Sequence, residues 1–165
     1  MKVFEPFKLG NLELKNRMVV SAMVTNYCSP DGRATEKFIA YHEHKARGGW
    51  GLIITEDYAV TPTAGGFVRL PGLWEDGQIQ SHRELTERVH RAGGKIAAQI
   101  YHAGRETSSA VTGVQPVAPS PVKEPSMPET PRELTVEEIH ELVEQFGDCA
   151  RRAREAGFDA VEVHG

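Results

Sequence analysis

Apolar positions recur along the chain with two different periods, and the change from one to the other marks the elements. Near-continuous apolar runs follow glycine at three places: "GGWGLIIT" (48–55), "GGKIAAQI" (93–100) and "GFDAVEV" (157–163). A strand that helices cover on both faces reads as such a run rather than as an alternating pattern. Glycine fits the left-handed position that ends the preceding helix. The pattern therefore predicts three buried parallel strands, each entered from a helix.

The most regular helical pattern lies at 135–156. Its apolar residues repeat at steps of three or four, as expected for one face of a helix. This stripe comprises Ile139, Leu142, Val143, Phe146, Ala150 and Ala153. Thr135 and Glu138 have the spacing of a capping box, and arginines gather near the end where the helix dipole is negative. The sequence therefore predicts a long helix that begins at Thr135.

Two further helices and a first strand complete the alternation. Ser81 and Glu84 have the spacing of a second capping box, which predicts a helix that ends at Gly93. Another helix is predicted at about 35–47, and "RMVVSAM" (17–23) reads as the first strand. The order is then strand, helix, strand, helix, strand, helix, strand, so three crossovers join four parallel strands.

This order predicts an α/β fold. Periodicity alone does not separate an open doubly wound sheet from part of a (β/α)₈ TIM barrel. A complete barrel takes about 250 residues, so four strands within 165 residues would form its first half. Residues 7–17 read as a hairpin across Gly10 and Asn11 that would plug the bottom of the barrel. We expect residues 1–165 to be one incomplete domain, the N-terminal half of a barrel.

Composition narrows the classes of function. Acidic residues outnumber basic ones by 23 to 19, so nucleic acid finds no general attraction. No stretch approaches the roughly 20 apolar residues of a membrane helix, and the N-terminus lacks the apolar core of a signal peptide. We therefore expect a cytoplasmic protein with no membrane partner. Cys28 and Cys149 lie far apart and form no CxxC pattern, which predicts reduced, structural thiols and no metal site.

Polar side chains follow the predicted strands at their carboxyl ends. Parallel strands bring these ends to one edge, where barrel enzymes build their active sites. The residues are Ser21, Ala22, Met23, Val24, Thr55, Glu56, Asp57, Tyr58, Gln99, Tyr101, His102, Arg105, Glu162 and His164. Each has a structural explanation as well, such as a satisfied interior amide for Gln99. The Pro- and Ser-rich segment 108–134 is either a flexible connection or an active-site loop. Together these residues suggest a site for a planar polar ligand.

Five motifs in order carry a resemblance to a known family. They are "LKNRMVVSAM" (14–23), "GLIITEDYAVTP" (51–62), "AQIYHAGR" (98–105), "PVAPSPV" (116–122) and "EAGFDAVEVHG" (155–165). The sequence resembles the Old Yellow Enzyme family of flavin-dependent ene reductases. The likeness is closest to the NADH:flavin oxidoreductase branch, which includes bacterial dienoyl-CoA, enoate and bile-acid reductases. It covers essentially the whole chain and corresponds to the N-terminal half of the family's (β/α)₈ barrel.

The resemblance implies an FMN site. Ala22, Met23 and Val24 match residues that form the wall beside the isoalloxazine ring, partly through backbone groups. Asp57 falls where the second strand approaches the flavin. Gln99 matches the amide that bonds the pyrimidine edge of the ring, a role suited to a side chain with both a donor and an acceptor. Many relatives have proline where this chain has Ala22, and Thr, Cys or His where it has Val24, so a different reduction potential is expected.

The resemblance also implies a reaction. His164 matches the residue that donates a hydrogen bond to the oxygen of an activated alkene, a bond that strengthens as negative charge builds on that oxygen. Hydride would pass from NADH or NADPH through the flavin to the β-carbon of a small unsaturated substrate, such as an enone or enoyl-CoA. Tyr27 and Tyr58 are weaker candidates for catalysis. The family's second His or Asn, its proton-donating Tyr and its flavin-phosphate site have no counterpart in these residues.

Other interpretations remain open at this stage. A phosphate-binding barrel lyase or aldolase also uses strand-end residues, but it usually has a lysine or a carboxylate cluster there. The chain is also expected to be a fragment, because "VEVHG" stops inside a family motif. Alone it could be an inactive half-barrel that self-associates through open sheet edges. An iron–sulfur cluster and an FAD domain, as in larger relatives, would lie only in a region beyond it.

Overall fold

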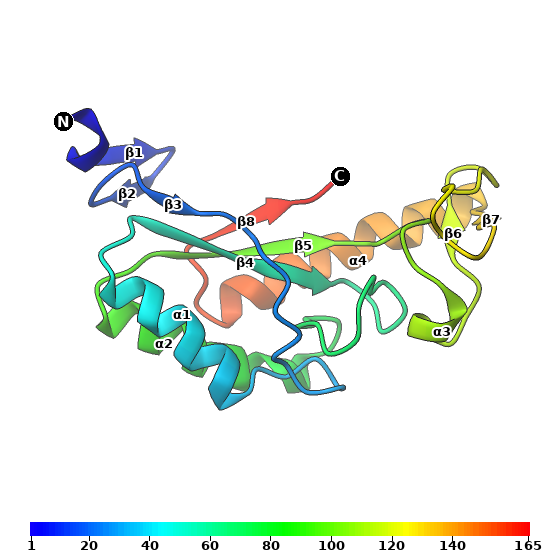
Figure 1. Cartoon of the computed structure of the whole chain (residues 1–165), viewed down its shortest axis with the longest axis horizontal. Helices are drawn as coiled ribbons and strands as arrows, with labels where there is room; N and C mark the ends of the chain where they lie inside the picture. Colours follow the sequence, from blue (N-terminus) through cyan, green and yellow to red (C-terminus); the bar gives the residue numbers. More distant parts are fainter.

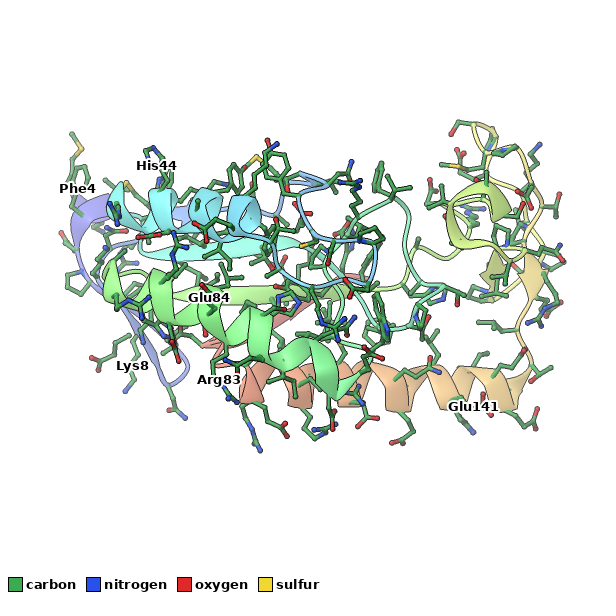
Figure 2. All side chains as sticks on the ribbon, turned by 90° about the horizontal axis from the view of Figure 1, so that it is seen from below. Phe4, Lys8, His44, Arg83, Glu84 and Glu141 are labelled. Carbon is green, nitrogen blue, oxygen red and sulfur yellow. The ribbon has the colours of Figure 1, made fainter.

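The fold is a twisted parallel sheet with helices on one face, seen in a computed structural model that describes residues 1–165. Four strands lie in the order β3 (Val19–Val20), β4 (Leu52–Ala59), β5 (Ile96–Tyr101) and β8 (Ala160–Val163), and all neighbours are parallel. The crossovers are α1 (Glu36–Arg47), α2 (Ile79–Arg91) and α4 (Val136–Glu155). Figure 2 shows these helices side by side over the sheet. The predicted order of strands and helices is confirmed.

The main hydrophobic core lies between the sheet and these helices. It contains 23 buried residues, among them Phe38 of α1, Ile53 of β4, Leu85 of α2 and Cys149 of α4. Both cysteines are buried, and neither forms a disulfide. No helix of the structure is long and apolar enough to span a membrane.

The predicted hairpin is present at the amino ends of the strands. It consists of β1 (Phe7–Leu9) and β2 (Leu12–Leu14), paired antiparallel across Gly10, whose φ of 58° lies in the left-handed region. Leu14 of this hairpin packs with Leu52 and Ala97 on the face of the sheet that the helices leave open. Figure 1 shows the hairpin at one end of the sheet and the segment after β5 at the other.

The predicted glycine junctions are also confirmed. Gly49, Gly93 and Gly157 follow α1, α2 and α4, with φ angles of 91°, 75° and 90°. A residue with a side chain is strained in this conformation. Each helix therefore ends at a fixed point from which the chain turns into the next strand.

The start of α2 differs from the prediction. A 3₁₀ turn, η2 (Asp76–Gln78), comes first, and Glu75 with Gln78 forms the capping box in place of Ser81 with Glu84. Ser81 lies inside the helix, and its hydroxyl donates to the carbonyl of Gln78 at 2.9 Å. The reciprocal bonds of the earlier pair move the helix start to Ile79.

The burial of α4 and β8 is lower than predicted. The capping box of Thr135 and Glu138 is confirmed. However, Ile139 and Val143 point to solvent, and Val143 is 61% exposed. The rest of the predicted stripe does face the core: Ala153 is buried, and Leu142, Phe146 and Ala150 pack against the core beside buried Cys149. Val163 of β8 is 66% exposed, so this strand is less covered than β4 and β5, most of whose residues are buried.

The segment 108–134 contains more order than its composition indicates. It includes a short helix, α3 (Ser109–Thr112), and two short parallel strands, β6 (Val117–Ala118) and β7 (Arg132–Glu133). A first 3₁₀ turn, η1 (Lys2–Phe4), precedes the hairpin at the other end of the chain. The predicted first strand, 17–23, is shorter than expected because only Val19 and Val20 pair with β4.

Candidate functional site

Three polar side chains form a row across the carboxyl end of the sheet. Asp57 of β4 is the register partner of Gln99 in β5, and Gln99 is the partner of Glu162 in β8. The preceding row, nearer the amino ends of the strands, contains Ile54, Ala97 and Ala160, which pack with the hairpin. The open face of the sheet therefore changes from apolar to polar toward its carboxyl edge.

A bulge in β4 decides which carboxylate joins this row. Ile54 pairs with Ala97 and Asp57 pairs with Gln99, so three steps along β4 match two steps along β5. Without the extra residue, Glu56 would stand opposite Gln99. A shift of one residue moves side chains to the other face of a strand. The bulge therefore gives the open face to Asp57 and buries Glu56.

Gln99 is held by a direct bond to Glu162. Its Nε2 donates to Oε1 of Glu162 at 2.6 Å. A carboxylate can only accept, so the NH₂ group of the amide must face Glu162. The carbonyl oxygen of Gln99 consequently lies on the side turned away from β8.

The segment after β3 carries three of the predicted site residues along the same edge. Ala22 is half-buried, whereas Met23 is 48% and Val24 39% exposed, which leaves an apolar surface available to a ligand. The backbone N–H of Thr25 donates to Oε2 of the buried Glu56 at 2.5 Å. This bond fastens the segment to the end of β4.

His164 lies one residue beyond β8, at the same edge. Its backbone N–H donates to the carbonyl of Ile100 at 3.0 Å, and its ring stacks on Tyr101 with 6.3 Å between the centroids. Burial raises the pKa of Asp57, and the nearby charge of His164 partly opposes that shift. The structure thus brings Asp57, Gln99 and His164 to one edge, as predicted.

A pocket of about 360 Å³, here called the rim pocket, opens beside His164. Asp57, Tyr101 and His102 from the strand ends contribute to it. Sequence reasoning missed three other lining residues, Phe67, Glu106 and Met127, which come from loops. Only the position of those loops after β4 and β5 pointed to them, because loop residues carry no periodic signal.

The two tyrosines considered from the sequence do not line the rim pocket. Tyr58 is fully buried, and its hydroxyl is 2.8 Å from Nδ1 of His82 in α2. Tyr27 packs edge-on against Tyr41 of α1. These contacts give both tyrosines structural roles. No group of three or more His, Cys, Asp or Glu side chains is arranged to hold a metal ion.

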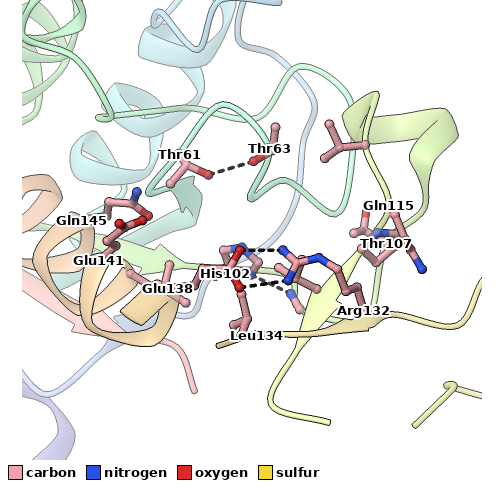
Figure 3. Close-up of a pocket in the computed structure, with 15 residues that line it drawn as sticks. Thr61, Thr63, His102, Thr107, Gln115, Arg132, Leu134, Glu138, Glu141 and Gln145 are labelled. Atoms are coloured by element: carbon pink, nitrogen blue, oxygen red, sulfur yellow. Dashed lines mark hydrogen bonds and ion pairs between the residues drawn. The ribbon is translucent and has the colours of Figure 1, made fainter. Parts of the chain in front are cut away.

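A second pocket, of about 440 Å³, lies farther out between the loop after β4, the segment 108–134 and the first turns of α4 (Figure 3). It shares His102 with the rim pocket. Nδ1 of His102 accepts the N–H of Gly104 at 2.9 Å, so in the neutral ring the proton is on Nε2. Arg132 forms two bonds to Glu138 here, at 2.8 and 2.9 Å, which fasten the segment to α4.

Comparison with known proteins identifies the family of this chain. The profile of the NADH:flavin oxidoreductase / NADH oxidase family matches residues 2–165. The chain belongs to this family. It is 44% identical to the NADH oxidase of Thermoanaerobacter brockii over 165 residues, which are 99% of this chain and 25% of that protein.

Solved structures of family members share the fold. The Old Yellow Enzyme homologue of Zymomonas mobilis superposes with a TM-score of 0.90 at 34% identity, covering 99% of this chain and 48% of that one. Morphinone reductase in complex with tetrahydroNAD gives 0.91 at 36% identity, covering 99% and 49%. The chain therefore spans a quarter to a half of these family members. The predicted resemblance to Old Yellow Enzyme is confirmed, as is the fold of half a (β/α)₈ barrel.

Proposed function

We propose that this chain supplies part of the flavin and substrate site of an FMN-dependent oxidoreductase that takes hydride from NADH or NADPH and reduces an activated C=C bond. The observation that carries the proposal is the polar row at the carboxyl edge, with an apolar segment on one side and His164 on the other. Family membership supports the flavin. The similarity to morphinone reductase, solved with tetrahydroNAD, supports a nicotinamide reductant.

The residues at this edge fit FMN. An isoalloxazine ring is planar and largely apolar, with one edge that offers an N–H between two carbonyl groups. The exposed side chains of Met23 and Val24 would lie against the ring, next to half-buried Ala22. Gln99 would bond the polar edge, and Asp57, its register partner, would lie beside that edge. When bound, FMN accepts and donates hydride, which no side chain can do.

His164 is the proposed catalytic residue. Its position beside the rim pocket allows the ring to donate a hydrogen bond to the carbonyl or nitro oxygen of an alkene held there. That bond strengthens as negative charge develops on the oxygen, so it favours the transition state. Phe67 and Met127 would give the substrate apolar walls. We infer a small unsaturated substrate, such as an enone or an enoyl thioester.

The flavin assignment is tested on the full-length protein. We expect a yellow absorbance that NADH or NADPH bleaches under anaerobic conditions and that an enone restores. A colourless protein that does not take up added FMN would overturn the proposal.

The role of His164 is tested by His164→Ala, with His140→Ala on the exposed face of α4 as the matched control. We expect enone turnover to fall by about one to two orders of magnitude in His164→Ala, at the lower end of the loss seen when one oxyanion donor is removed. Flavin reduction by NAD(P)H should change far less. Equal turnover in the two variants would remove His164 from the mechanism.

A further inference from the structure

The bond between Gln99 and Glu162 has a consequence for ligand recognition. A glutamine amide offers a donor on one side and an acceptor on the other, and rotation by 180° exchanges the two. Glu162, as a carboxylate, accepts only, and its Oε1 is 2.6 Å from Nε2 of Gln99. The partner thus selects one of the two orientations.

The strand register keeps this pair in place. Gln99 and Glu162 occupy directly paired positions of β5 and β8, so both side chains leave the sheet on the same face. Ala97 and Ala160, the pair two residues earlier, are small and pack against the hairpin side of the open face. The pair is therefore built into the sheet and is not a chance contact of two surface side chains.

Asp57, the other register neighbour of Gln99, limits which groups a ligand can place at this position. Asp57, on the other side of Gln99, contributes a second carboxyl group that accepts hydrogen bonds when ionised. With its NH₂ group directed to Glu162, Gln99 offers its carbonyl oxygen away from β8. A ligand at this position is therefore recognised through an N–H group that donates a hydrogen bond to the carbonyl oxygen of Gln99.

We propose that Glu162 is a positioning residue that fixes the Gln99 amide so that its carbonyl oxygen accepts the imide N–H of the flavin ring. This inference rests on the proposed function, since it assigns a partner to one edge of FMN. Glu162 itself does not touch the ligand. Its effect passes entirely through the orientation of Gln99.

The first test compares Glu162→Gln with the wild type in the full-length apoprotein. The introduced amide can either accept from or donate to Gln99, so both orientations of Gln99 become available. We expect the dissociation constant of FMN to rise about tenfold, which corresponds to one neutral hydrogen bond. In ¹⁵N-labelled FMN, the N3 signal should move toward that of a weaker hydrogen bond. Glu144→Gln on the exposed face of α4 makes the same charge change and should alter neither.

A double substitution separates orientation from simple packing. In Gln99→Glu alone, two carboxylates face each other and FMN binding should fall more than in Glu162→Gln. In Gln99→Glu with Glu162→Gln, the new amide donates to the new carboxylate, which still presents an acceptor to the ligand. We expect this exchange to restore affinity to within a few fold of the wild type. If Gln99 instead donates to FMN, the exchanged pair cannot bind it, and the inference fails.

Failure of this inference differs from failure of the proposed function. A wild type that binds FMN as tightly as Glu162→Gln, with the same N3 signal, overturns the inference alone. A wild type that binds no FMN overturns the proposed function. The amide orientation can then still be read in the ligand-free protein, where a carboxylate partner moves one NH₂ proton of Gln99 downfield in the wild type but not in Glu162→Gln. Equal signals in the two proteins would overturn the positioning role.

Discussion

Replacing Glu56 by alanine tests how the segment after β3 is held to the sheet. Glu56 is 1% exposed, and its Oε2 accepts the N–H of Thr25 at 2.5 Å. Alanine leaves this N–H without a partner, and an unsatisfied buried donor costs about 1–3 kcal/mol. One kcal/mol corresponds to roughly 2–4 °C in a domain of 150–250 residues, and to less in a larger domain. At about 2 °C per kcal/mol, we expect the melting temperature of the full-length protein to fall by roughly 2–6 °C.

Glu56→Gln distinguishes the bond from the charge. The side-chain oxygen of Gln can still accept the backbone N–H of Thr25. Its NH₂ group can donate to Oγ1 of Thr25, which has no partner in the structure. Burial raises the pKa of Glu56, and the neighbouring Asp57 charge raises it further. Folding therefore shifts the equilibrium of this carboxyl group toward its neutral form. We expect Glu56→Gln to retain the melting temperature that Glu56→Ala loses.

The difference in stability between the wild type and Glu56→Gln should depend on pH with a definite sign. Below the unfolded pKa of 4.5, the carboxyl group is protonated in both states and adds no pH-dependent term. As pH rises from there through the folded pKa, ionisation favours unfolding, so the wild type loses stability relative to Glu56→Gln. Thermal unfolding between pH 4 and pH 8 measures this gap, with Glu144→Gln as the control. A gap that is constant, or that closes as pH rises, would refute the reasoning.

Three further substitutions test the scaffold, each by thermal unfolding of the full-length protein. Gly51→Ala would place a Cβ 2.4 Å from the backbone oxygen of Asn16, and overpacking of this kind costs about 1–3 kcal/mol; an unchanged melting temperature would contradict that contact. Thr135→Ala removes the N-cap of α4 and should cost about 1 kcal/mol, whereas Thr135→Ser should retain most of it. Tyr58→Phe leaves Nδ1 of buried His82 without its partner and should cost about 1–3 kcal/mol; a neutral effect would show that the bond adds nothing.

Most of the scaffold could be predicted because its signals are local. The cap of α4 depends on two residues three positions apart, Thr135 and Glu138, whose reciprocal bonds need no other part of the chain. The glycine at the end of each helix is specified by backbone geometry alone, as the φ of 90° at Gly157 illustrates. Because right-handed crossovers between parallel strands admit few arrangements, these local elements nearly determine the strand order.

The parts that could not be predicted depend on competition or on distant partners. Ser81 and Glu84 have the spacing of a capping box, but Glu75 and Gln78 form the capping box a few residues earlier. The sequence pattern does not show which of two overlapping capping boxes forms. Val143 belongs to the apolar stripe of α4 by period, yet its burial depends on whether another element covers that side. The sequence shows which residues share one face of the helix, but it does not show which element covers that face.

The candidate site shows the same division. Its edge could be predicted, because carboxyl ends of parallel strands meet, but the bond from Gln99 to Glu162 requires the register between β5 and β8. Neither residue type nor spacing along the chain specifies that register. Phe67 and Met127 were missed because their loops have no period to place them against the strand ends.

The bulge in β4 connects stability with the proposed chemistry. Two adjacent carboxylates, Glu56 and Asp57, lie within β4, and a regular strand would place Glu56 opposite Gln99. One extra residue reverses this: Asp57 joins the row on the open face, and Glu56 turns inward to hold Thr25. Removing the extra residue would exchange the two roles and release the segment that carries Met23. The bulge is therefore a requirement of the proposed site, because it lets one strand place Asp57 on the open face and fasten the neighbouring segment through Glu56.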